Sequence, residues 1–317
     1  MLYPWQKTQW KSISQQIQQQ RLPHALILTG VVGLGKLTLA NHIVAKVLCE
    51  NTHEHDACGS CHSCQLFIAG NHPDHTFIEP EDEGKLIKIE QIRSLKDKQE
   101  LTPTIAKWKT VIISPAENMN INANNSLLKL LEEPQQNTLL VLVSAKPERL
   151  PITILSRCHK ITFNVPDTKS AFSFVQQSSV LKEHDISTLL ELAKGAPLAA
   201  LTLHESNIIE HLSQLDKDFE SLLAKQANPV SLTKSWLQYD HLIVFNYLQN
   251  TVKKKLIQLQ NKDDKTKSKQ YWVIYDCIIE AIKLTSSSNN INKTLLIEQF
   301  MVSIMDGNLD KLSAINS

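Results

Sequence analysis

Gly30-Val-Val-Gly-Leu-Gly-Lys36 is the stretch that decides the fold of this 317-residue chain. It follows a short apolar run, His24–Thr29, that predicts a buried strand, and it precedes Lys36–Cys49, whose apolar residues recur at helical spacing. Glycines let a backbone turn tightly around a phosphate group, and a lysine meets the phosphate oxygens. A strand, a glycine-rich loop and a helix in this order predict a phosphate-binding P-loop in an α/β fold.

The rest of the first half of the chain alternates between strand-like and helix-like stretches. Helical patterns occur near Ile89–Leu101 and Asn124–Glu133. The strand-like runs are His75–Glu79, Thr110–Ser114, Thr138–Ser144 and Lys160–Val165. Such alternation is typical of a parallel sheet with helices on its faces.

After Pro166-Asp167-Thr168 the strand-like runs stop and the pattern becomes helical. We therefore expect three domains: an α/β P-loop domain over 1–165, a small helical domain over 166–207 and an all-α domain over 208–317. The expected helices are Ser170–Val175, Ile186–Lys194 (ended by Gly195-Ala-Pro197), Ile209–Lys225, Ser231–Gln249, Tyr271–Leu284 and Lys293–Met305. Two polar stretches, Asn261–Lys269 and Ser286–Asn292, are predicted to be exposed loops.

Composition narrows the possible partners and compartment. The segment beginning Met1-Leu-Tyr-Pro-Trp5 has no basic stretch followed by an apolar core, and no apolar run approaches membrane-spanning length, so we expect a cytoplasmic protein without a membrane partner. The formal net charge is +1, which gives no global attraction to nucleic acid. The lysines at 253–255, 262, 265, 267 and 269 are interpreted as solvated surface, and we assign them no role.

A cysteine cluster predicts a metal site. Cys58, Cys61 and Cys64 follow each other at Cys-x2-Cys spacing, and Cys49 stands at the end of the helix after the P-loop. In a reducing compartment such cysteines rarely form structural disulfides, whereas thiolates at this spacing suit tetrahedral Zn²⁺. The fourth ligand stays open at this point, because the competing imidazoles are His53, His55 and His62. A site with four protein ligands would be structural.

The predicted nucleotide site is incomplete. The residue after Lys36 should carry a hydroxyl group for Mg²⁺, but it is Leu37, and Thr38 would point about 100° further around the helix. The strand Thr110–Ser114 should lead into acidic residues, but Ser114-Pro115 follows, and Glu117 is too far along to be counted on. We expect no self-contained hydrolysis. ATP binding by the loop residues Gly30, Gly33, Gly35 and Lys36 is left open.

Arg157 is the remaining candidate. It lies in Ser156-Arg157-Cys158, after a short helix that Pro151 is placed to open. An arginine supplied in trans to a neighbour's γ-phosphate can raise a rate by roughly 10³–10⁵. By composition alone, a surface salt bridge is the favoured alternative.

Together these motifs resemble bacterial clamp-loader subunits of the AAA+ class, and within it the delta-prime family of DNA polymerase III. The resemblance covers roughly residues 3–205. It rests on the P-loop, the cysteines and two further segments, Leu127-Leu-Lys-Leu-Leu-Glu-Glu-Pro134 and Leu150-Pro-Ile-Thr-Ile-Leu-Ser-Arg-Cys158. It implies a two-part AAA+ module followed by a helical collar domain, in a five-subunit ring that opens the sliding clamp and places it on primed DNA.

The resemblance also assigns roles to residues. It implies that Zn²⁺ is bound by Cys49, Cys58, Cys61 and Cys64, and that Arg157 reaches into the ATP site of an adjacent motor subunit. Leu198 stands where active subunits carry a sensing arginine, which adds to the losses at Leu37 and at Ser114-Pro115. The implied role is a non-hydrolysing part of a polymerase holoenzyme, with motor and delta-type subunits as direct partners and the clamp and primed DNA as indirect ones.

Two other functions compete with this one. The intact loop Gly30–Lys36 favours an active ATPase motor subunit of the same complex, while Ser114-Pro115 opposes it. A zinc-dependent nucleic-acid-binding module is disfavoured, because the net charge is near neutral and no basic face rich in aromatic residues is present.

Overall fold

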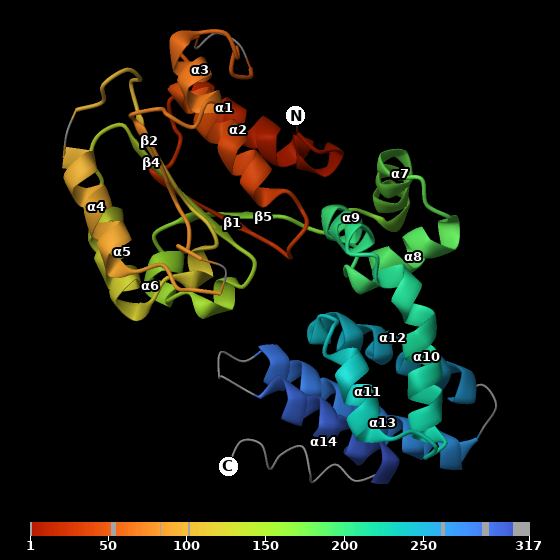
Figure 1. Cartoon of the computed structure of the whole chain (residues 1–317). Coiled ribbons are helices and arrows are strands. Elements are labelled where there is room, and N and C mark those ends of the chain that lie inside the picture. Colours follow the sequence, from red (N-terminus) through yellow and green to blue (C-terminus); the bar gives the residue numbers. More distant parts are fainter. Residues whose placement is uncertain are drawn as a thin grey trace. The chain divides into compact units, whose positions relative to one another are not determined.

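A computed structural model describes residues 2–51, 55–82, 84–100, 102–260, 264–286 and 292–306. The chain divides into two compact units, one of residues 1–171 with 196–199 and one of residues 172–195 with 200–317 (Figure 1). Each unit is described by itself.

In the first unit the described residues form a five-stranded parallel sheet in the order β2-β3-β4-β1-β5. The strands are β1 (Ala25–Thr29), β2 (His75–Ile78), β3 (Lys109–Ile113), β4 (Thr138–Ser144) and β5 (His159–Thr162). All of them coincide with or overlap the predicted runs. The parallel sheet, the helices around it and the helical remainder confirm the predicted α/β fold with a helical second part.

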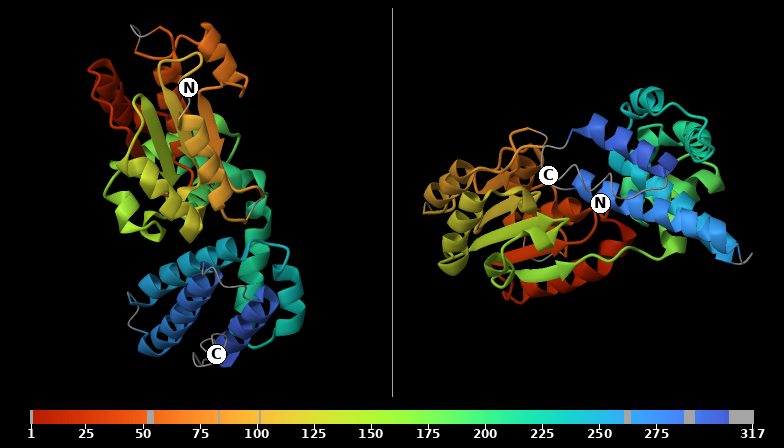
Figure 2. Two further views of the ribbon diagram at one scale, coloured as in Figure 1. Left: turned by 90° about the vertical axis from the view of Figure 1, so that its left-hand side faces the viewer. Right: turned by 90° about the horizontal axis from the view of Figure 1, so that it is seen from below.

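Helices cover both faces of this sheet, as Figures 1 and 2 show. The helices are α1 (Lys7–Gln18), α2 (Lys36–Leu48), α3 (His62–Ile68), α4 (Ile89–Glu100), α5 (Ile121–Glu132) and α6 (Ile152–Leu155). Because side chains alternate along a strand, Leu26 and Leu28 pack in the core that holds α1 and α2, whereas Ala25 and Ile27 pack in the core that holds α4, α5 and α6. Both faces of the central strands are therefore buried, which explains why these strands are continuous apolar runs in the sequence.

The described residues of the second unit form helices and the turns between them. The helices from residue 168 onward are α7 (Thr168–Ser178), α8 (Glu183–Leu192), α9 (Pro197–Glu205), α10 (Ile208–Leu223), α11 (Pro229–Trp236), α12 (His241–Gln260), α13 (Lys265–Ser286) and α14 (Lys293–Asp306). Trp236, Phe245 and Phe300 are buried together in its core. The indole N–H of Trp236 donates to Asp218 Oδ2 at 2.9 Å, so the buried nitrogen is satisfied.

Two predictions in this region are wrong. The single helix expected over Ser231–Gln249 is two helices, because Asp240 Oδ1 accepts from the backbone N–H groups of Leu242 and Ile243 and so begins α12. The loop expected over Asn261–Lys269 is helical from Lys265, where Asp264 Oδ1 accepts from the N–H of Lys267. Residues 261–263 and 287–291 of the two expected loops lie outside the described residues.

Three helices have no counterpart in the sequence-based prediction, namely α1, α3 and α9. α1 is mostly polar and buries little beyond Trp10 and Ile13, so its periodicity is weak. α9 begins at Pro197, which had been interpreted as the end of the preceding helix; proline is equally suited to the first turn of a new helix.

The two compact units do not test the predicted domain boundaries at 165/166 and 207/208. The division into three domains therefore stays a prediction. No single helix among the described residues is long and apolar enough to cross a membrane. The bent pair α8 and α9 taken together would be long and apolar enough, by length and composition alone.

Candidate phosphate, metal and arginine sites

The P-loop lies between the end of β1 and the start of α2. Gly33 and Gly35 have φ values of +83° and +72°, in the left-handed region that favours glycine. A Cβ on Gly33 would also lie 2.4 Å from the Cβ of Ala199, so this position has no room for a side chain. The loop has the tight, glycine-dependent turn that the sequence predicts.

Lys36 is held by the loop itself. Its Nζ donates to the carbonyl oxygens of Gly30 at 2.7 Å and Val31 at 2.8 Å, and the residue is only 7% exposed. Burial lowers the pKa of Lys36, while the negative charge of Glu117 acts in the opposite direction. The lysine is therefore a buried cation that is already coordinated by backbone oxygens.

Two other segments brace the loop. From the N-terminal segment, Trp5 Nε1 donates to Leu34 O at 3.0 Å, and Gln6 Nε2 donates to Gly35 O at 2.7 Å. From the first turn of α9, the N–H of Leu198 donates to Gly33 O at 3.2 Å. Leu198, the residue at the expected arginine position, thus contacts the P-loop through its backbone.

Glu117 is the functional candidate that the sequence analysis undervalued. Its Oε1 accepts from the backbone N–H groups of Ala145 at 2.9 Å and Lys146 at 3.2 Å, just past the end of β4. Ser114 and Pro115 directly follow β3, as predicted, and bring no carboxylate there. The sequence places Glu117 four residues past the end of β3, which suggests that it is too far from the site. The sequence analysis does not predict the short 3₁₀ turn Ala116–Asn118, which contains Glu117.

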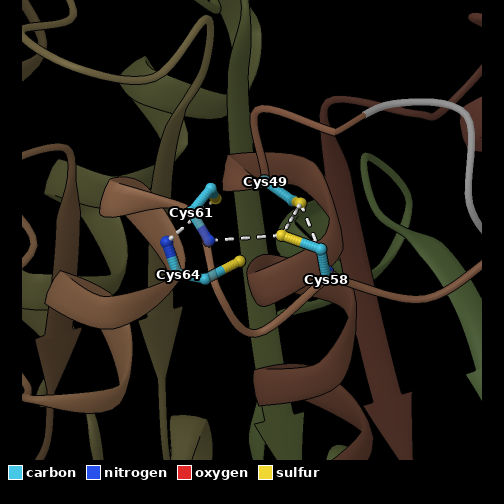
Figure 3. A group of neighbouring side chains, drawn as sticks. All are labelled: Cys49, Cys58, Cys61 and Cys64. Atoms are coloured by element: carbon cyan, nitrogen blue, oxygen red, sulfur yellow. Dashed lines mark hydrogen bonds between the residues drawn. The ribbon is translucent and has the colours of Figure 1, made fainter.

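The four predicted cysteines come together (Figure 3), with all four Sγ atoms within 4.8 Å of one another. Cys49 follows the last residue of α2, and Cys61 is the N-cap of α3, where its Sγ accepts from the N–H of Cys64 at 3.4 Å. Backbone N–H groups of Cys58 and Cys61 likewise point to the Sγ atoms of Cys49 and Cys58, both at 3.4 Å. Such N–H···S contacts stabilise thiolates.

The geometry fits a tetrahedral metal. Four sulfur ligands at about 2.3 Å from Zn²⁺ stand about 3.8 Å apart, and the Sγ atoms of Cys49 and Cys58 are 3.6 Å apart. Hydrogen bonds, first from the backbone of Ser60, lower the pKa of Cys58 to about 6, whereas burial raises the pKa of Cys49 and Cys64. A bound cation would offset that burial cost, because metal ligation deprotonates thiols.

No histidine joins the cysteine group among the described residues. His55 Nδ1 is instead 3.2 Å from Gln18 Nε2, and His53 lies outside the described residues. A buried polar chain supports the cluster from behind: Ser63 Oγ donates to Leu48 O at 2.6 Å and accepts from His72 Nε2 at 2.8 Å. Sequence reasoning missed this support, because it joins residues of two helices and of the loop before β2.

Arg157 is on the surface beside α6. Its Nη2 is 2.7 Å from Glu132 Oε1, at the end of α5, and its Nη1 donates to Thr153 O at 3.0 Å. The side chains of Arg157 and Glu132 are 37% and 50% exposed. The guanidinium is thus positioned by two contacts and keeps further N–H groups for another acceptor.

A family described as "DNA polymerase III, delta subunit" matches residues 5–167. DNA polymerase III subunit delta' of Pseudomonas aeruginosa is 31% identical over 321 residues, which cover 95% of this chain and 96% of that protein. The chain belongs to the DNA polymerase III delta' family. Subunit gamma from Buchnera aphidicola (subsp. Schizaphis graminum) is 31% identical to this delta' family member over 215 residues, 66% of this chain and 56% of that subunit. The crystal structure of a gamma subunit-related protein from Thermotoga maritima matches with a TM-score of 0.46 and 18% identity, covering 94% of this chain and 99% of that one.

Proposed function

We propose that this delta' family member is a non-hydrolysing clamp-loader subunit that helps load the sliding clamp onto primed DNA and supplies Arg157 to a neighbouring ATPase subunit. The observation that carries the proposal is the setting of Arg157. It is exposed, and the contacts with Glu132 and Thr153 orient it while leaving donors available. A planar guanidinium held in this way suits the γ-phosphate of a nucleotide bound by a neighbour.

The chain's own nucleotide site supports the non-hydrolysing part of the proposal. Phosphoryl transfer depends on positioning and on charge stabilisation by Mg²⁺ and its ligands. Leu37 supplies no hydroxyl group, Ser114 and Pro115 supply no carboxylate, and Leu198 supplies no cation. A site without these groups retains a phosphate-binding loop but not the means to activate water.

The proposed partners follow from the family. Motor subunits and a delta-type subunit would adjoin this chain in the ring, and the clamp and primed DNA would be reached through the complex. We assign ring assembly to the helical region from residue 208. Zn²⁺, held by Cys49, Cys58, Cys61 and Cys64, would be structural, because four protein ligands leave no open position for a substrate.

The alternative is an active motor subunit of the same complex. Retention of the glycine-dependent loop and of Lys36 favours it, as does the similarity to a gamma subunit. Turnover of ATP by the purified chain alone would support this alternative and exclude the non-hydrolysing role.

The arginine assignment is tested in a reconstituted clamp loader. We expect Arg157→Ala to lower ATP turnover by at least about tenfold, toward the 10³–10⁵ that a finger can contribute. Arg149→Ala is the matched control, since Arg149 is an exposed arginine on the nearby 3₁₀ turn Pro147–Arg149. Zinc content and assembly of the variant must equal those of the parent. Equal turnover with and without Arg157 would overturn the assignment.

A further inference from the structure

The pairing of β1 with β4 brings two opposite charges to neighbouring strand ends. Thr29 is in register with Ser144, so the next residues, Gly30 and Ala145, lie at adjacent positions past the sheet. Lys36 Nζ is bound at the carbonyl of Gly30, and Glu117 Oε1 is bound at the N–H of Ala145. The ammonium group and the carboxylate are therefore each anchored at the end of one of two paired strands.

The second oxygen of this carboxylate has unused capacity. Glu117 Oε2 is buried and accepts no hydrogen bond from the described residues. Lys36 is also shielded from water. Charges that are shielded from water interact more strongly than surface charges, because the effective dielectric constant is lower. The attraction between Glu117 and Lys36 is one of the two influences on the pKa of that lysine.

We propose that Glu117 is a resident counter-ion of the P-loop lysine and that it makes this loop disfavour nucleotide polyphosphates. A polyphosphate is attracted to the cation and to the loop amides. The negative charge of Glu117 offsets part of the positive charge of Lys36, and it repels an incoming phosphate group. Glu117 is thus a specificity-determining residue. This inference deepens the non-hydrolysing part of the proposed function, and it does not depend on Arg157.

The test measures binding of ATP and ADP to the purified full chain by calorimetry, with and without Mg²⁺. Glu117→Gln removes the charge but keeps Oε1 as an acceptor for the N–H groups of Ala145 and Lys146. We expect Glu117→Gln to bind ATP at least about tenfold more tightly than the parent in the absence of Mg²⁺. Adding Lys36→Ala should abolish the gain. Glu148→Gln, the same charge change on an exposed turn residue, should not produce it.

Several results would overturn the inference. The first is unchanged or weaker ATP binding by Glu117→Gln. The second is no measurable binding by either protein at millimolar ATP. The third is an ATP affinity of the parent that depends on Mg²⁺ and is lost in the variant, which would make Glu117 a metal ligand. Zinc content and the thermal midpoint report whether the fold is kept. Glu117→Ala, which removes both the charge and the cap, must change ATP affinity in the same direction. Nucleotide binding is measured on the isolated chain and the arginine test on the assembled loader, so this inference and the arginine assignment can fail separately.

Discussion

Replacement of Cys61 by serine isolates the contribution of the metal. Cys61 is both a proposed Zn²⁺ ligand and the N-cap of α3, where its Sγ accepts from the N–H of Cys64. Serine is among the best N-cap residues, so Cys61→Ser keeps the cap and removes one thiolate. Any loss of stability in this variant therefore reports on the metal site rather than on the helix.

The expected magnitude follows from the ligand set. The four Sγ atoms lie within 4.8 Å of one another, against about 3.8 Å in an ideal tetrahedron, so little rearrangement is needed to bind the ion. Structural Zn²⁺ binds with roughly 10–16 kcal/mol in small domains. Shared among four ligands, this is about 2.5–4 kcal/mol per thiolate, so the affinity should fall by about two to three orders of magnitude.

Zinc affinity would be measured by competition with a calibrated chromophoric chelator, and hydrogen exchange would follow the amides of α3. We expect Cys61→Ser to lose zinc and to exchange faster over α3. Cys277→Ser is the matched control, because Cys277 is a buried thiol in the second unit. Parent-like zinc affinity in Cys61→Ser would refute the ligand assignment, and so would an equal loss in Cys277→Ser.

Two further predictions concern Glu132 and His75. Glu132→Gln should change the unfolding free energy by less than about 1 kcal/mol, because its ion pair with Arg157 is exposed. The same variant should lower ATP turnover by the reconstituted loader a few-fold. If Glu132→Gln lowers turnover by the same factor when Arg157 has already been replaced by alanine, Glu132 does not act through the arginine. Burial, and secondly the charge of His72, lowers the pKa of His75 to about 4. Below about pH 6.5 this histidine is protonated in the unfolded chain but not in the folded one, so the unfolding free energy falls as the pH is lowered from 6.5 toward 4. His75→Phe should lose up to about 3 kcal/mol less over this range in denaturant titrations, whereas an identical acid profile would contradict the assignment.

Local signals were sufficient where burial is continuous. β1 and β4 are buried along their whole lengths and appear in the sequence as uninterrupted apolar runs. The P-loop and the Cys-x2-Cys spacing are equally local. By contrast, α1 and α3 have few buried residues, so their sequences show little apolar periodicity. Helices of this length are stable mainly in the folded protein, and their sequence pattern alone does not predict them.

The parts of the sites that sequence alone did not yield depend on long-range register. Glu117 binds the backbone past the end of β4 because a 3₁₀ turn follows β3, and the pairing of β4 with β1 brings that strand end next to the start of the P-loop. Spacing left the fourth sulfur position open between Cys49 and histidines, and the resemblance favoured the thiol. The fold places Cys49 in the cluster, because α2 ends immediately before it.

The most direct test compares two variants in one reconstituted clamp loader. Steady-state ATP hydrolysis would be measured with the parent chain, with Lys36→Ala and with Arg157→Ala, after equal assembly and zinc content have been verified. If the chain acts in trans, Lys36→Ala retains the turnover of the parent and Arg157→Ala loses at least about nine-tenths of it. Loss of turnover in Lys36→Ala, with parent-like turnover in Arg157→Ala, would show that the chain hydrolyses ATP itself.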